Sequence, residues 1–155
     1  MPSIVDPMDA FVTFQPALRR GEIELHRGDV DPNVFVHLDH PKGEPRYTYV
    51  RLEGQEVTAM AVFLLADPYE GKPCLQIGYA VAEHLRGQGR AKDVAKAAIA
   101  ELHAGMGRNG VRSFYIEAIV GADNPASQHV ADALFSVELS IGVQKGPLIG
   151  VQKGL

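Results

Sequence analysis

Cysteine is nearly absent from this sequence of 155 residues, because Cys74 is the only one. A single cysteine excludes an intramolecular disulfide and a four-cysteine zinc site, and it makes a reducing cytoplasm the default expectation. Cys74 begins a strand, where a small buried apolar residue is expected rather than a nucleophile. No metal site is predicted elsewhere, since His37 and His40 would point to different faces of a strand.

Long hydrophobic runs and an excess of basic charge are also missing. No apolar stretch approaches the roughly 18 residues needed to span a bilayer. Residues 1–10 carry no basic side chain and no long apolar core, so they are not interpreted as a signal peptide. The formal net charge is -4, without the overall basic field of a general nucleic-acid binder. We therefore expect neither a membrane nor a nucleic acid as partner.

The length and composition are typical of one globular domain. A chain of 155 residues that is 46% hydrophobic fits one domain with a real core better than two small ones. No low-complexity linker divides residues 1–155. The pentapeptide GVQKG occurs at 142–146 and again at 150–154, but two copies cannot form a repeat architecture. We interpret 137–155 as C-terminal strands in a hairpin that turns at Gly146-Pro147.

Runs of β-branched and aromatic residues predict a mainly antiparallel sheet. The expected strands are 34–38, 46–52, 57–65, 75–81 and 111–120. Glu53-Gly54 is read as a turn, and the prolines and glycine within 67–73 are read as a loop. Phe11 to Phe14 either open a strand or belong to a helix that reaches about Arg20.

Two helices are expected in the second half of the chain. The first has an apolar stripe of helical period, and Gly105 after it is a stop signal. The stripe consists of Ala91, Val94, Ala95, Ala98, Ile99 and Leu102. Asn124-Pro125 combines a favourable N-cap with proline at the first helical position, which predicts a helix to about Phe135.

The loop before the first of these helices carries the most chemical information. It reads RGQGRAK from Arg86 to Lys92. Its glycines allow the backbone to approach a ligand closely. The free N–H groups and the dipole of the helix start attract an anion such as pyrophosphate, and Arg86, Arg90 and Lys92 can add charge-assisted contacts. The alternative is a tight loop whose glycines serve packing only.

Two common phosphate-binding motifs do not fit this loop. A P-loop ends in Gly-Lys-Ser/Thr, which is not present. A dinucleotide fingerprint needs a third glycine within a parallel β-α-β unit, whereas Gly87-x-Gly89 is followed by Lys92 and the flanking strands are expected to be antiparallel.

The same residues resemble the GNAT family of N-acetyltransferases. Arg86-x-x-Gly89-x-Ala91 matches the family pattern Gln/Arg-x-x-Gly-x-Gly/Ala, between a strand ending GYAV and an Ala-rich helix. The strand at 114–120 that leads to NPAS at 124–127 resembles the second family region. The resemblance covers residues 46–135. It implies an α/β (α+β) fold with a mixed, mainly antiparallel sheet, flanking helices and splayed central strands.

The resemblance also implies a reaction and a cofactor site. The acetyl group would pass directly from acetyl-CoA to a primary amine of a small molecule or peptide, without a covalent acyl-enzyme. Backbone groups of Tyr79 to Val81 would hold the pantetheine arm and the thioester carbonyl, and Gly87 to Lys92 the pyrophosphate. Asn124 would contact pantetheine and Ser127 the CoA end. The cofactor-binding residues so implied are Tyr79, Ala80, Val81, Arg86, Gly87, Gln88, Gly89, Arg90, Ala91, Lys92, Asn124 and Ser127.

The catalytic groups depart from the family pattern. Ala131 occupies the position of the usual general-acid tyrosine, so Ser127, a water or another tyrosine would have to assist the leaving thiolate. Glu117 is the candidate general base, and a solvated glutamate on a strand face is the alternative. Three functions are compatible with the sequence: an active acetyltransferase, a catalytically silent acyl-CoA-binding module and a purely structural dimerisation domain. The sequence does not decide whether the protein is a homodimer or which amine is the acceptor.

Two further features have open interpretations. Tyr47, Tyr49 and Arg51 share a strand face and would either line an acceptor pocket or belong to the core and its rim. His84 precedes the glycine loop and would either face the cofactor or lie on the surface.

Overall fold

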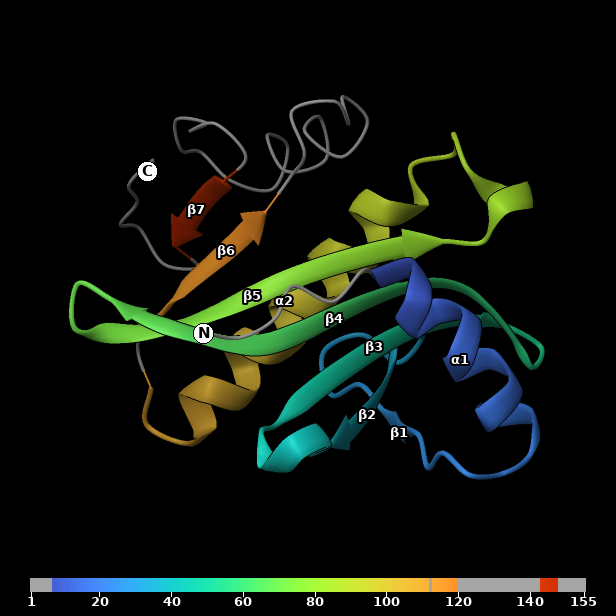
Figure 1. The fold of residues 1–155 in the computed structure, drawn as a ribbon, viewed down its shortest axis with the longest axis horizontal. Helices are drawn as coiled ribbons and strands as arrows, with labels where there is room; N and C mark the ends of the chain where they lie inside the picture. The colour runs from blue at the N-terminus through green and yellow to red at the C-terminus, as the bar shows by residue number, and fades with distance from the viewer. Residues whose placement is uncertain (1–6, 112, 120–142, 148–155) are drawn as a thin grey trace.

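The computed structural model describes residues 7–111, 113–119 and 143–147, and Figure 1 shows their arrangement. Seven strands form one sheet in chain order. They are β1 (His26–Arg27), β2 (Phe35–Asp39), β3 (Arg46–Glu53), β4 (Glu56–Tyr69), β5 (Lys72–Val81), β6 (Tyr115–Ile119) and β7 (Val143–Pro147). All neighbours are antiparallel except β5 and β6, which are parallel. The predicted mixed, mainly antiparallel α/β fold is confirmed.

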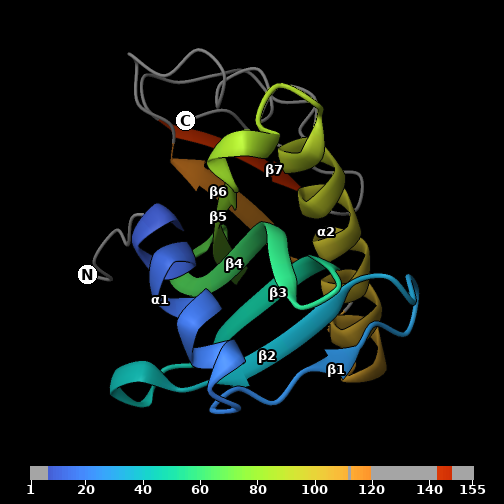
Figure 2. The ribbon, with the colours of Figure 1, turned by 90° about the vertical axis from the view of Figure 1, so that its right-hand side faces the viewer.

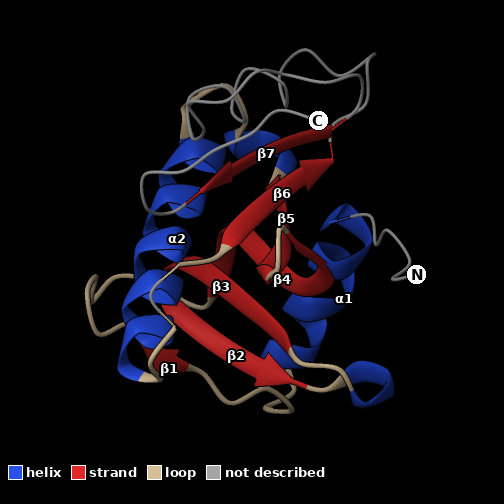
Figure 3. Cartoon of the chain, turned by 90° about the vertical axis from the view of Figure 1, so that its left-hand side faces the viewer, coloured by secondary structure: helices blue, strands red, loops and turns tan. Residues whose placement is uncertain are grey.

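Two helices cover opposite faces of this sheet (Figures 2 and 3). They are α1 (Pro7–Arg19) and α2 (Arg90–Arg108), and short 3-10 turns occur at η1 (Pro41–Gly43) and η2 (Glu83–Leu85). The N-terminal segment is therefore helical, which decides between the strand and the helix considered for Phe11 to Phe14. No described helix is long and apolar enough to cross a membrane.

The core has two parts because side chains alternate between the faces of each strand. On the face under α2, Tyr49, Phe63 and Ile77 of the sheet belong to one buried cluster with Val94 and Leu102 of the helix. On the other face, Phe14 of α1 packs with Val50, Met60 and Val62. Burying each such large apolar side chain stabilises the fold by about 1.5–3 kcal/mol, so both helices are fixed by packing.

The loop expected within 67–73 is wrong, because β4 and β5 continue almost to each other. The register shifts between Ala66 and Tyr69, and Tyr69 pairs with Lys72. Pro68 and Pro73 lie within this irregular stretch. Proline is tolerated in strands where the hydrogen-bonding ladder is interrupted, so these two residues mark a bulge and not a break.

Helix α2 is longer than the sequence predicted. It continues through Gly105 and ends before Asn109, whose backbone N–H bonds to the carbonyl oxygens of Met106 and Gly107, and Gly110 then adopts φ 82°. A glycine inside a helix costs about 1 kcal/mol relative to alanine. Packing of Met106 against the core under α2 offsets that cost.

Two expectations about strand pairing are also wrong. The strands that flank α2 are parallel, since α2 carries the chain from the end of β5 back to the start of β6. Gly146 and Pro147 lie in β7, where they pair with Ile116 and Tyr115, and so they do not form the turn of a hairpin. Both errors concern long-range partners that local sequence patterns do not specify.

Candidate functional site

The site is built around the turn between β5 and α2. After η2, Gly87 and Gly89 have φ values of 78° and 74°, a left-handed conformation that only glycine adopts readily. A Cβ atom built at either glycine would meet no atom within 4 Å. Backbone conformation, and not crowding, therefore requires glycine at both positions.

Backbone hydrogen bonds fasten the start of this turn to the sheet. The N–H of Ala82 donates to the carbonyl of Thr58 in β4 at 3.0 Å, and the N–H of Leu85 donates to the carbonyl of Ala82 at 2.9 Å. Arg86 extends this anchoring, because its Nε donates to the carbonyl of Val81 at 3.4 Å. The glycine turn therefore begins at a strand end that is held by hydrogen bonds.

The start of α2 has no side-chain cap. Gly89 is the N-cap residue and makes no side-chain cap hydrogen bond, and the N–H of Asp93 donates to its carbonyl at 3.0 Å. The N–H groups at the start of a helix have no partner within the helix. Such N–H groups and the helix dipole attract anions in general; in α2 the corresponding residues are Arg90 to Lys92.

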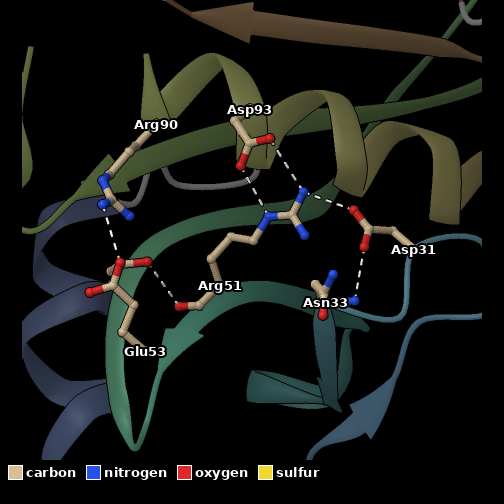
Figure 4. Close-up of polar contacts among 7 residues, drawn as sticks. Asp31, Asn33, Arg51, Glu53, Arg90 and Asp93 are labelled. Carbon is tan, nitrogen blue, oxygen red and sulfur yellow. Dashed lines mark hydrogen bonds and ion pairs between the residues drawn. The ribbon is translucent and has the colours of Figure 1, made fainter. Parts of the chain in front are cut away.

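Four charged side chains surround this helix start in two ion pairs (Figure 4). Arg90 Nη2 lies 3.2 Å from Glu53 Oε1, and Arg90 Nε donates to Gln88 Oε1 at 3.2 Å. Arg51 donates to both carboxylate oxygens of Asp93, at 3.0 and 3.3 Å. The guanidinium of Arg90, expected to bind phosphate, is thus in contact with a carboxylate in this structure.

Arg51 has a second carboxylate partner. Its Nη2 lies 2.8 Å from Asp31 Oδ2 in the loop between β1 and β2. The hydrogen bond from Arg51, together with one from the backbone N–H of Asn33, lowers the pKa of Asp31 below its ordinary value. Sequence reasoning missed the roles of Asp31, Glu53 and Asp93, since only the fold brings them to the helix start.

Strand β5, which leads into the glycine turn, pairs in parallel with β6. The register of β5 with β6 runs from Cys74–Tyr115 to Ile77–Ala118. Strand β5 continues to Val81, and β6 is described as far as Ile119. Tyr79 to Val81 lie beyond the last described pair with β6, and the splay of the central strands stays a prediction, because residues 120–142 lie outside the described part of the chain.

Glu117 lies near the end of the described pairing between β5 and β6. It pairs in register with Gln76, one residue before the last β5–β6 pair. Alternation along β6 places it with Tyr115 on the face opposite Ile116, which belongs to the cluster under α2. Its side chain is half-buried, so a carboxylate lies near the last described β5–β6 pair.

Tyr115 lies beside Glu117 on that face and contacts residues of the β4–β5 hairpin. Its hydroxyl donates to Glu70 Oε2 at 3.1 Å, and its ring packs edge-on against Tyr69 with centroids 4.7 Å apart. Burial and then the bond to Glu70 raise the pKa of Tyr115. The phenol therefore stays protonated at neutral pH and holds the β4–β5 hairpin against β6.

The tyrosines of β3 belong to the core and its rim. Tyr49 is buried under α2 and packs edge-on against Phe63. Burial, followed by the charge of Glu101, raises the pKa of Tyr49 above its ordinary range. Tyr47 packs against the same cluster, and the acceptor-pocket interpretation of these residues finds no support here.

The remaining candidates have ordinary structural partners. Cys74 is buried in β5, as predicted. His84 is exposed and lies 3.2 Å from Glu56, and His37 Nδ1 lies 3.0 Å from the carbonyl oxygen of Glu24. In the described part of the chain, no group of three or more His, Cys, Asp or Glu side chains could hold a metal ion. Asn124, Ser127 and Ala131 lie outside the described residues.

Comparison with known proteins identifies the family. Residues 14–134 match the profile of the Acetyltransferase (GNAT) family, and the chain belongs to this family. Its members generally transfer an acetyl group from acetyl-CoA, their co-substrate, to an amine. No curated protein matches the sequence.

Several solved structures are similar to this chain. The chain is similar to an N-acetyltransferase from Staphylococcus aureus Mu50, with 23% identity over 59% of this chain and 51% of the other, and a TM-score of 0.43. It is similar to a ribosomal L7/L12 alpha-N-protein acetyltransferase in complex with coenzyme A, with 27% identity, coverage of 61% and 49%, and a TM-score of 0.41.

A third similar structure is that of the KacTA–DNA complex, at 13% identity, 66% and 68% coverage, and a TM-score of 0.51. This likeness concerns the fold alone. The match spans about half the length of the first two structures.

Proposed function

We propose that this protein is an N-acetyltransferase that transfers the acetyl group directly from acetyl-CoA to a primary amine of a small molecule or peptide. One observation carries the proposal: an uncapped helix start behind two left-handed glycines directly follows β5, which pairs in parallel with β6. The predicted splay of these two strands would form an opening beside it. A pyrophosphate would bind at the helix start, and the pantetheine arm would run into the opening.

The cofactor would bind through this chain's own backbone and side chains. The N–H groups of Arg90 to Lys92 would take the pyrophosphate, and the strand end Tyr79 to Val81 would pair with the pantetheine amides in place of β6. Asn124 and Ser127 would complete the site from the second family region. Positioning of the thioester and polarisation of its carbonyl would supply most of the rate enhancement.

The position of Glu117 on β6 favours a role as general base. It lies one residue before the last described β5–β6 pair, and an amine attacking a thioester in the predicted opening would be near it. The carboxylate would take the amine proton directly or through a water. The amine nitrogen then forms the new bond to the acetyl carbon, and the CoA thiolate leaves, with Ser127 as the candidate proton donor.

Binding of the cofactor tests the central claim. Calorimetry should detect binding of acetyl-CoA to the parent protein, and the ligand should raise the Tm. Gly89→Glu should abolish binding, because it places bulk and negative charge at the helix start. Gly71→Glu is the matched control: Gly71 has φ 76° and open space around its Cβ position, but lies in the β4–β5 turn. Absence of binding to the parent at millimolar ligand would refute the proposal.

A silent acyl-CoA-binding module is the second candidate, and Ala131 at the position of the family's tyrosine favours it. General acid catalysis contributes about 10²–10⁴-fold, so an enzyme without this phenol would be slow but measurable. CoA thiol release with a panel of primary amines separates the two. Release that Glu117→Gln abolishes and that Ala131→Tyr increases would support the enzyme; binding without release to any amine would support the silent module.

A further inference from the structure

The end of β3 faces the first turn of α2 with two opposite charges. Arg51 and Glu53 are two residues apart, so they project from the same face of the strand. Arg51 contacts Asp93 and Glu53 contacts Arg90. These two ion pairs lie directly beside the proposed pyrophosphate position (Figure 4). In one pair the strand supplies the cation and the helix the anion, and in the other pair the strand supplies the anion and the helix the cation.

Asp93 has an electrostatic effect on any anion bound at this helix start. A carboxylate in the first turn interacts favourably with the positive end of the helix dipole. A bound pyrophosphate would use the same positive potential, and the negative charge of Asp93 would repel it. Arg51 donates to both oxygens of Asp93, and this contact offsets the repulsion.

Arg51 is well placed to perform this role. Its side chain is only 19% exposed, against 58% for Asp93, so Arg51 is the more buried partner of the pair. A second bond, to Asp31 at 2.8 Å, holds the guanidinium between the β1–β2 loop and α2. Lysine would retain the charge but could not keep the planar, two-sided contact.

Glu53 acts in the opposite direction. Its carboxylate occupies the guanidinium of Arg90 at 3.2 Å, and Arg90 is the first residue of α2. The side chain of Glu53 is 61% exposed, and an exposed ion pair of this kind is weak. A pyrophosphate with two negative charges would compete for Arg90 against a single, solvated carboxylate.

We propose that Arg51 and Glu53 set the charge at the pyrophosphate end of α2 and thereby tune affinity for CoA in opposite directions. Arg51 is a positioning residue that masks Asp93, whereas Glu53 is an internal competitor that releases Arg90 when the anion binds. This inference rests on the proposed function and assigns new roles to residues outside the glycine motif.

The experiment measures the dissociation constants of CoA and of pantetheine, which lacks the pyrophosphate, by calorimetry. Arg51→Met should weaken CoA binding about two- to fivefold, and Glu53→Gln should strengthen it by a similar factor, since charges near a helix end have effects of this size. Asp93→Asn should strengthen binding alone and restore it in the Arg51→Met background. Pantetheine affinity should not change in any variant.

Two matched controls use ion pairs elsewhere in the fold. Arg46→Met removes a half-buried arginine that is paired with Asp39, and Glu22→Gln removes an exposed carboxylate that is paired with Arg20. Both should leave the affinity for CoA unchanged. If Arg51→Met does not fold, the exposed positions Glu53 and Asp93 still carry the test, because each single variant should strengthen CoA binding.

The sign of the Glu53→Gln effect separates this proposal from a purely structural role. A structural role predicts that Arg51→Met and Glu53→Gln both weaken CoA binding, and that result would overturn the proposal. Unchanged CoA affinity in both variants, or equal effects on pantetheine, would also overturn it while leaving the acetyl-CoA site intact. Failure of the parent protein to bind CoA would refute the proposed function and this inference together.

Discussion

The substitution Glu101→Gln tests how the β1–β2 loop is held against α2. Glu101 is buried, with 7% of its surface exposed. Its carboxylate accepts three backbone N–H bonds, from Asp29 at 2.7 Å, Val30 at 2.8 Å and Asp31 at 2.6 Å. A glutamine has nearly the same shape, but it has one acceptor oxygen and one NH2 donor in place of two acceptor oxygens.

The expected loss follows from these three bonds. If the amide oxygen keeps the bonds from Val30 and Asp31, the NH2 group faces the N–H of Asp29, which is left without an acceptor at a cost of about 1–3 kcal/mol. The two retained bonds become neutral, and each loses about 1 kcal/mol of charge assistance. The free energy of unfolding should therefore fall by about 4 kcal/mol. For a domain of this size, that loss lowers the Tm by about 8–16 °C.

Differential scanning calorimetry and urea denaturation measure this effect. Glu44→Gln is the control, because Glu44 is exposed and its replacement should change the Tm little. Hydrogen exchange at the amides of Asp29 to Asp31 should accelerate in Glu101→Gln only. A variant as stable as the parent, with unchanged exchange at these amides, would refute the reasoning.

Other predictions concern the same region. Gly28→Ala should destabilise the fold by about 1–3 kcal/mol, because a Cβ there would meet the carbonyl oxygen of Asp31 at 2.5 Å; equal stability in urea would contradict this close approach. Gly107→Ala should stabilise by about 0.5–1 kcal/mol in the same assay, since Gly107 is helical with open space around it. Arg51 lowers the pKa of Asp31 below its ordinary value, so the pair stabilises the fold fully above that ordinary pKa and less as pH falls through the lowered pKa. The stability difference between the parent and Arg51→Met should thus be smaller near pH 3 than near pH 7, and a larger difference near pH 3 would contradict it.

Much of the fold and the outline of the site could be predicted from local patterns. The stripe from Ala91 to Leu102 predicted α2, and the glycines at 87 and 89 predicted the turn at its start. Both depend on dihedral preferences and periodicity within a few residues. The same locality explains the errors at Pro68 and Gly105, where proline and glycine read as breaks while long-range packing and a bulge overrode them.

The sequence alone determined the family, through the spacing of Arg86, Gly89 and Ala91 before an amphipathic helix. Only the tertiary structure decided the parallel pairing of β5 with β6 and the charge environment of the helix start. Glu101 binds backbone groups 70 to 72 residues earlier in the chain, and Arg51 reaches Asp93 across 42 residues. Local propensity carries no information about such partners. A charged side chain on a strand or helix has the same local sequence pattern whether it faces solvent or a partner, and only the packing of the sheet brings that partner within hydrogen-bonding distance.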